Sequence, residues 1–218
     1  PDNLSQNLDI ELTFPYLFYT RFGTDLSFHL QKTDTSYLQL NFSPGLQYYF
    51  HGTNYIKLYY QYNNTRLIAT KHLREIIALP EHIDFDLHLY GLEVFYRKLD
   101  YVFNPRKGYS LLASAAIGNR NIIINNNIPK ELYADIEQNT FHIKSMADVS
   151  LYLPIKRRWT WMNRLQGAYL HGKNLFENEL FRLGGSNTLR GFIEQSMYAS
   201  SYALFTTEIR FLFSKNSY

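Results

Sequence analysis

Residues 182–192, which read RLGGSNTLRGF, contain an arginine, Arg190, that the local backbone does not need. Arg190 stands between a leucine and a glycine, in a segment that otherwise holds a glycine pair and small polar residues. A turn uses glycine and small polar residues for its backbone, but it has no need of an arginine. The planar guanidinium binds a carboxylate through two N–H groups at once, so Arg190 predicts an ion pair that fixes a loop. An exposed arginine beside ordinary turn glycines is the alternative.

The composition is that of one all-β domain that could hold such a loop. The chain has 218 residues, and its 19% of charged residues excludes a bundle of hydrophobic helices. No run approaches the about 18 apolar residues of a membrane-spanning helix, but a transmembrane β-barrel needs only alternate apolar residues. The absence of cysteine excludes disulfides, thiol nucleophiles and thiolate metal sites. A net charge of +3, without a basic stripe, argues against a nucleic-acid partner.

Alternation of apolar and polar residues predicts about nine strands. In residues 140–153 the odd positions are mostly apolar and the even positions mostly polar, and residues 201–213 repeat this pattern. The other predicted strands are 8–14, 25–31, 38–42, 56–62, 84–99, 109–117 and 159–171. Within 84–99 the apolar positions change parity at Gly91, where we expect a β-bulge.

Short and long connections alternate along the chain. The short ones are 51–53, 100–107 and 154–158, and the long ones are 63–83, 119–139 and 172–200. Residues 33–35 are an exception, because they form a short turn at the end where the other connections are long. Short periplasmic turns, long external loops and strands of about 9–11 residues with aromatic ends are typical of outer-membrane barrels. In the first long loop, residues 71–79 predict a helical turn or an extended hairpin tip. A soluble β-sandwich or lipocalin-like barrel also alternates and remains an alternative.

The odd number of strands is informative by itself. An antiparallel sheet with an odd number of strands cannot close on itself by antiparallel pairing, and an open edge is not tolerated in lipid. We therefore expect an antiparallel transmembrane β-barrel of which this chain supplies only a part.

Segment 182–192 resembles the arginine-glycine-aromatic loop of the outer-membrane insertase superfamily, which includes BamA, TamA and the two-partner-secretion translocators. Four more segments resemble parts of a BamA-type barrel in the same order: DIELTFPY at 9–16, YRKLDYVFNPRKG at 96–108, SLYLP at 150–154 and ALFTTEIRF at 203–211. The resemblance implies that residues 1–218 form roughly the fourth to twelfth strands of a sixteen-stranded barrel, without the periplasmic repeats that usually precede it.

The resemblance also implies roles for the motif. In that family the loop folds back into the barrel and its arginine contacts acidic residues of the inner wall, so residues 172–200 are expected to do this through Arg190. The expected roles of the neighbours are backbone freedom at Gly184 and Gly185, close passage along the wall at Gly191, and packing beside the arginine at Phe192, with Leu189 completing the motif. The carboxylates on predicted lumen faces are Glu208, Asp148 and Glu11. We assign none of them, because the family's usual acidic partners lie on later strands.

Other polar groups carry less information. His29 and His142 are predicted to be solvated residues of the lumen wall, since they lack neighbours at metal-ligand spacing. Asp148, His142 and a nearby serine lack the glycines of a nucleophile elbow, so we expect no catalysis. The basic pairs and triplets at 106–107 and 156–158 lie in predicted periplasmic turns, where they meet either lipid headgroups or solvent.

The function implied by the resemblance is assistance in inserting nascent outer-membrane proteins into the bacterial outer membrane. The lipid bilayer, the nascent proteins and accessory lipoproteins are the implied partners, and no cofactor or metal is expected. The alternatives are a passive pore, a structural barrel subunit of a surface complex, a two-partner-secretion-type translocator, and a soluble barrel that binds an apolar ligand.

Overall fold

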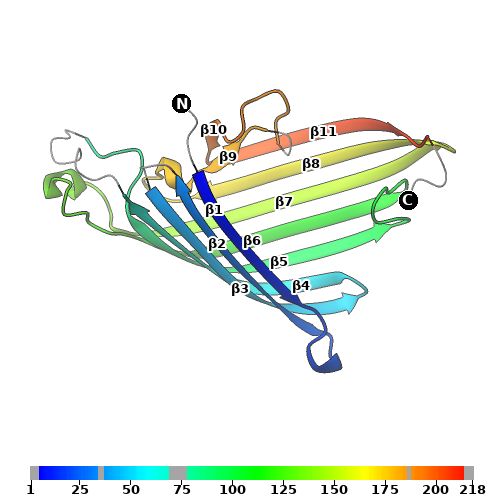
Figure 1. The fold of residues 1–218 in the computed structure, drawn as a ribbon, viewed down its shortest axis with the longest axis horizontal. Helices are drawn as coiled ribbons and strands as arrows, with labels where there is room; N and C mark the ends of the chain where they lie inside the picture. The colour runs from blue at the N-terminus through cyan, green and yellow to red at the C-terminus, as the bar shows by residue number, and fades with distance from the viewer. Residues whose placement is uncertain (1–4, 34–36, 69–77, 186–187, 214–218) are drawn as a thin grey trace.

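In the described part of the chain, nine strands form one antiparallel sheet in chain order, and a separate two-stranded hairpin lies in the connection before the last of them (Figure 1). The computed structural model describes residues 5–33, 37–68, 78–185 and 188–213. The strands are β1 (Ser5–Phe14), β2 (Phe22–Thr33), β3 (Tyr37–His51), β4 (Asn54–Leu67), β5 (Phe85–Leu99), β6 (Gly108–Ile122), β7 (Asn139–Lys156), β8 (Trp159–His171) and β11 (Ser201–Phe211). The sheet is open and curved, with β1 and β11 at its edges. The predicted partial antiparallel barrel is confirmed.

The connections fall into two groups at opposite ends of the sheet, as predicted (Figure 1). At the short-turn end they are 15–21, 52–53, 100–107 and 157–158; at the long-loop end they include 68–84, 123–138 and 172–200. The helical segments η1 (Leu17–Tyr19), η3 (Lys130–Tyr133) and η4 (Glu177–Glu179) are short 3-10 turns. Among the described residues, no helix is long and apolar enough to cross a membrane.

Several strands extend beyond their predicted ends. β4 runs to Leu67 and β6 runs to Ile122, so the long loops start later than predicted at 63 and 119. Polar residues continue the pairing there, and Arg66 forms an ion pair with Asp86 on the neighbouring β5 (2.9 Å). The predicted helical turn at 71–79 lies almost wholly outside the described residues.

The predicted bulge at Gly91 is wrong. β5 pairs in unbroken register with β4 and with β6, and Gly91 lies opposite Tyr59 and Ala116. The parity of apolar residues changes for another reason. Near the long-loop end, Phe85, Leu87 and Leu89, which share one face of β5, are buried in an apolar cluster with Ile83, Ala116, Ile122, Ile128 and Tyr133. Further along the strand, the exposed apolar residues Tyr90 and Leu92 lie on the other face.

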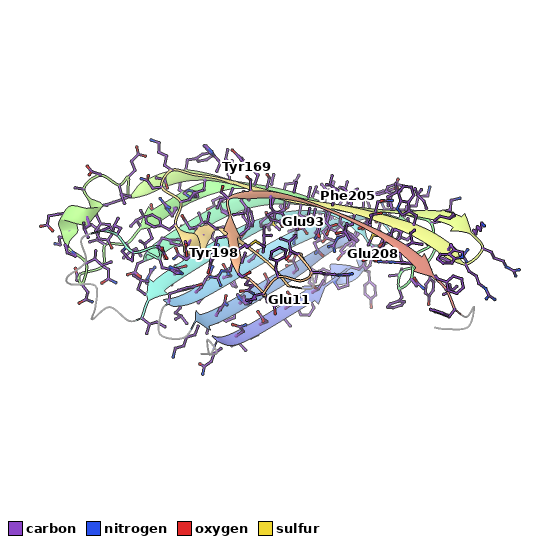
Figure 2. All side chains as sticks on the ribbon, turned by 90° about the horizontal axis from the view of Figure 1, so that it is seen from above. Glu11, Glu93, Tyr169, Tyr198, Phe205 and Glu208 are labelled. Carbon is purple, nitrogen blue, oxygen red and sulfur yellow. The ribbon has the colours of Figure 1, made fainter. Side chains whose placement is uncertain are left out.

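The two faces of the curved sheet differ in polarity. Figure 2 shows Tyr169 and Phe205 on the convex face, whereas Glu93 and Glu208 point toward the concave side. On β5 the convex residues between His88 and Lys98 are Tyr90, Leu92, Val94 and Tyr96. Such an apolar stretch, bounded by polar residues about ten positions apart, has the length of a strand crossing a bilayer. The convex face is therefore the lipid face, and the concave face is the wall of the lumen.

Asp100 organises the turn between β5 and β6. Its Oδ1 accepts hydrogen bonds from the backbone N–H groups of Tyr101 (3.0 Å), Arg106 (2.9 Å) and Lys107 (3.0 Å). Partial burial by itself raises the pKa of Asp100, but these three donors hold the pKa below its usual value. Because the pKa is lowered in the folded state, the stabilisation is present above the unfolded pKa of about 3.9. It is lost as the pH falls through the folded pKa.

We expect Asp100→Ala to release the turn while leaving the barrel folded. Because Asp100 is exposed and screened by solvent, each of these hydrogen bonds contributes about 0.5–1.5 kcal/mol, so amide hydrogen exchange at Arg106 and Lys107 should accelerate by roughly two- to tenfold. The matched control is Asn104→Ala, an exposed change in the same turn that should leave both amides protected. Unchanged exchange in the Asp100→Ala variant would show that the carboxylate does not hold the turn.

Candidate functional site

The connection between β8 and β11 contains a short hairpin on the concave side of the sheet. Its strands are β9 (Phe181–Leu183) and β10 (Met197–Ala199), paired from Phe181↔Ala199 to Leu183↔Met197. Figure 2 shows Tyr198 of β10 on the same side as Glu93 of the lumen wall. The tip of this hairpin carries the arginine-containing motif.

The glycines of the tip have backbone conformations that favour glycine. Gly184 has a φ of +118°, and a Cβ at this position would lie 2.1 Å from the carbonyl oxygen of Ile193. Thr188 Oγ1 accepts from the N–H of Gly184 (2.9 Å) and donates to its carbonyl (3.0 Å), which closes the tip. Gly185 has a φ of +88° and donates to the carbonyl of Phe192 (3.2 Å). Substitution at Gly184 would therefore open the tip.

Gly191 differs from the expectation. Its φ is +92°, which favours glycine, but apart from its chain neighbours no atom of the described residues lies within 4 Å of the position that a Cβ would take. The expected close passage along the wall is therefore absent, and the requirement for glycine comes from the backbone angle. Leu189 and Phe192 flank Arg190 and Gly191. Phe192 is exposed, and its N–H donates to the carbonyl of Leu189 (3.4 Å).

Arg190 contacts Glu208, one of the three candidate carboxylates. Its Nη2 lies 3.2 Å from Oε1 of Glu208 on the inner face of β11. The other oxygen, Oε2, accepts from Nε (3.1 Å) and Nη2 (2.9 Å) of Arg210. The Arg190 side chain keeps 75% of its surface exposed and Glu208 keeps 24%. Ion pairs this exposed contribute only about 0–1 kcal/mol, so the contact orients the tip without holding it strongly.

The other two candidates have different surroundings. Asp148 is bound by Arg164, whose Nη2 lies 2.5 Å from Oδ2 and whose Nε lies 3.0 Å from Oδ1. Glu11 lies on β1 on the concave side (Figure 2) and forms no ion pair within the described part of the chain. The structure therefore brings Arg190 to Glu208 and leaves Asp148 and Glu11 apart from it.

A buried ion pair holds the base of the same loop, and the sequence did not predict it. Arg120, near the long-loop end of β6, donates from Nη1 to Oε2 of Glu179 in η4 (2.6 Å), and the two side chains are 0% and 1% exposed. Arg120 also donates to the backbone carbonyls of Lys173 (3.1 Å) and Asn174 (2.9 Å). Its guanidinium lies 5.5 Å from the ring centroid of Phe176. One arginine of the wall thus binds four residues of the loop.

His142 belongs to this buried group, contrary to the prediction of a solvated wall histidine. The imidazole is 0% exposed, and its Nε2 lies 3.6 Å from Oε1 of Glu179. A Cβ on Gly172 would lie 2.4 Å from Nε2, so the first glycine of the loop leaves room for the ring. The returning loop therefore covers His142. His29, the other predicted solvated histidine, contacts the Asp9 carboxylate on β1.

Further contacts attach the hairpin to the wall of the lumen. Asn178 donates from Nδ2 to the carbonyl of Ile83 (2.9 Å), next to the apolar cluster. Arg182 of β9 contacts the hydroxyl of Tyr37 on β3, and the Lys144 ammonium lies 5.8 Å from the Phe181 ring centroid. Between loop and wall remains a cavity of about 310 Å³ whose lining is mainly polar. The loop thus lies against the concave face and leaves this polar cavity beside it.

Among the described residues, one group of side chains has the composition of a cation site. Glu81, His82 and Glu177 place one ligand atom each within 4.8 Å of one another, near the base of the loop. Glu177 donates its N–H to the carbonyl of Glu81 (3.0 Å), so a backbone contact already explains why these residues lie together. We assign no metal to this group.

Comparison with known proteins supplies the family context. The model of the Omp85 superfamily domain matches residues 2–218. The crystal structure of BamA from Haemophilus ducreyi lacking POTRA domains 1–3 superposes with a TM-score of 0.57 and 17% sequence identity, covering 88% of this chain and 38% of that chain. At this identity the likeness concerns the fold. No curated protein matches the chain significantly.

The buried Arg120–Glu179 pair predicts a large effect of truncation. Removing one partner of a buried ion pair leaves an uncompensated charge and costs about 3–5 kcal/mol. We expect Arg120→Ala to lower the free energy of unfolding by this order in urea titrations of the refolded full-length protein, and to make residues 172–185 accessible to protease.

The matched control is Lys173→Ala. Lys173 pairs with Glu137 in the same region (2.6 Å), but the two side chains are 69% and 57% exposed, so the change should cost at most about 1 kcal/mol. Similar losses in both variants would contradict a special role of the buried pair.

Proposed function

Because the chain belongs to the Omp85 superfamily, we propose that its barrel assists the insertion of other outer-membrane proteins into the bilayer. The observation that supports this role best is the contact between Arg190, at the tip of an inward-folded loop, and Glu208 on the barrel wall. In this proposal the short turns face the periplasm and the long loops face outward. The substrates are nascent outer-membrane proteins, with accessory lipoproteins as further partners.

The loop is held at two points of very different strength. Its base is fixed through the buried Arg120–Glu179 pair, whereas its tip depends on the exposed Arg190–Glu208 pair. We propose that the tip changes its contacts during insertion while the base stays in place. Local opening of weakly held segments needs little free energy, so such a change is compatible with a stable barrel.

Insertion by strand addition requires an exposed edge with which a substrate strand can pair. Strands β2 to β8 pair with neighbours on both sides, so they offer no such edge. We therefore propose that β2 to β8 form a rigid wall that positions the loop. The substrate strand then pairs with a strand elsewhere in the barrel.

A passive pore is the second candidate, and the polar cavity of about 310 Å³ between loop and wall supports it. Both functions place the β9–β10 hairpin in the lumen, so geometry alone does not separate them. They differ in what the Arg190 contact does. In an insertase the Arg190 contact holds the loop in the position that assembly of other proteins requires. In a pore the contact only narrows the channel through the barrel.

We expect Arg190→Ala to lower the assembly of other outer-membrane proteins by roughly three- to tenfold while this barrel itself is inserted at its normal level. The second part follows because an exposed ion pair contributes only about 0–1 kcal/mol. The measurement is the amount of folded outer-membrane proteins, by heat-modifiable gel mobility, in cells that depend on the variant.

Two further variants sharpen the result. Arg190→Lys keeps the charge but loses the forked donor, so it should have an intermediate effect. Arg158→Ala, an exposed change in the turn between β7 and β8, should have none. Normal assembly of other proteins together with altered ion conductance in Arg190→Ala would favour the passive pore and reject the insertase.

A further inference from the structure

The short-turn end of the barrel carries a strong excess of positive charge. In residues 15–21, 51–54, 97–108 and 154–160 the cationic residues are Arg21, Arg97, Lys98, Arg106, Lys107, Lys156, Arg157 and Arg158. Asp100 is the one acidic residue in these segments. Its ionised carboxylate lies beside Lys98 and Lys107 and offsets one of these eight positive charges, so the excess remains strongly positive.

An apolar groove opens beside these cations. It has a volume of about 510 Å³, and its lining includes Tyr109, Leu151 and Leu153, which are 42%, 40% and 38% exposed. Tyr109 lies opposite Leu151 in the β6–β7 pairing, so both side chains are on the lipid face. The groove therefore opens toward lipid and not toward the lumen.

Two lysines line the same groove at its polar end. Lys98 lies opposite Tyr109 in the β5–β6 pairing and is the first charged residue after the apolar stretch on the convex face of β5. Lys107, in the turn held by Asp100, also lines the groove. At the end of a bilayer crossing, ammonium groups reach the depth of lipid headgroups while the neighbouring apolar side chains remain at acyl-chain depth.

We propose that this groove binds an anionic phospholipid of the leaflet that surrounds the short turns, with its phosphate at Lys98 and Lys107 and an acyl chain along Tyr109, Leu151 and Leu153. Charge complementarity selects an anionic headgroup, because the neighbouring turn adds Lys156, Arg157 and Arg158 to the same positive field. The site depends on the position of the barrel in a membrane and not on insertion activity, so it can fail or succeed independently of the proposed function.

The test uses the full-length protein in phosphatidylethanolamine bilayers that contain a minor fraction of phosphatidylglycerol. Native mass spectrometry of the released protein then compares the retained lipids with the bulk composition. We expect the wild type to enrich phosphatidylglycerol. The enrichment should fall about fivefold for each of Lys98→Gln and Lys107→Gln, the effect expected of one cation near an anionic surface.

Two variants separate a site from general attraction. Leu151→Trp fills the groove and leaves all cations in place, so it should also lower retention of phosphatidylglycerol. Lys130→Gln removes an exposed charge at the opposite end of the barrel and should change nothing. Wild-type enrichment in the Lys98→Gln/Lys107→Gln double variant or in Leu151→Trp would overturn the proposal, as would an equal loss in Lys130→Gln.

Discussion

The buried ion pair between Arg120 and Glu179 is the interaction on which the arrangement of the lumen depends. Two charges removed from water are tolerable only if each finds partners, and Arg120 finds them on the loop that returns over β6. When residues 173–179 take another position, both charges lose their main contacts. This constraint fixes the base of the loop, from which the β9–β10 hairpin reaches Tyr37 of β3 through Arg182 and Glu208 of β11 through Arg190.

In the proposed function, the contrast between base and tip allows the tip to move while the barrel stays rigid. The base combines complete burial with a charged hydrogen bond of 2.6 Å, whereas Arg190 at the tip keeps most of its surface in solvent. Since Glu208 is also bound by Arg210, it remains paired when Arg190 leaves. Release of the tip therefore abandons no buried charge, and its cost is the small one of an exposed ion pair.

Much of the fold could be predicted because side chains on the convex face must be apolar where they meet lipid, which makes every second residue of a strand apolar. Where that rule alone applies, as along β7 and β11, apolar residues alternate and the strands were placed correctly. At the long-loop end Phe85, Leu87 and Leu89 pack under a loop on the lumen side, which reverses the parity and imitates a bulge at Gly91. The motif identified Arg190 and offered Glu208 among three carboxylates. Arg120 and Glu179 carried no local signal, because their contact joins positions 59 residues apart.

The two ends of the barrel are mechanically linked through β6 and β7. These strands pair without a break from Gly108↔Tyr152 at the short turns to Asn121↔Asn139 at the long loops. The same ladder thus carries Tyr109 and Leu151 of the lipid-facing groove at one end, and Arg120 and His142 of the loop anchor at the other. A continuous ladder has a fixed rise per residue, so the depth at which the short turns sit in the membrane determines the height of the anchor. The membrane depth of the short turns and the position of the loop are therefore parts of one constraint.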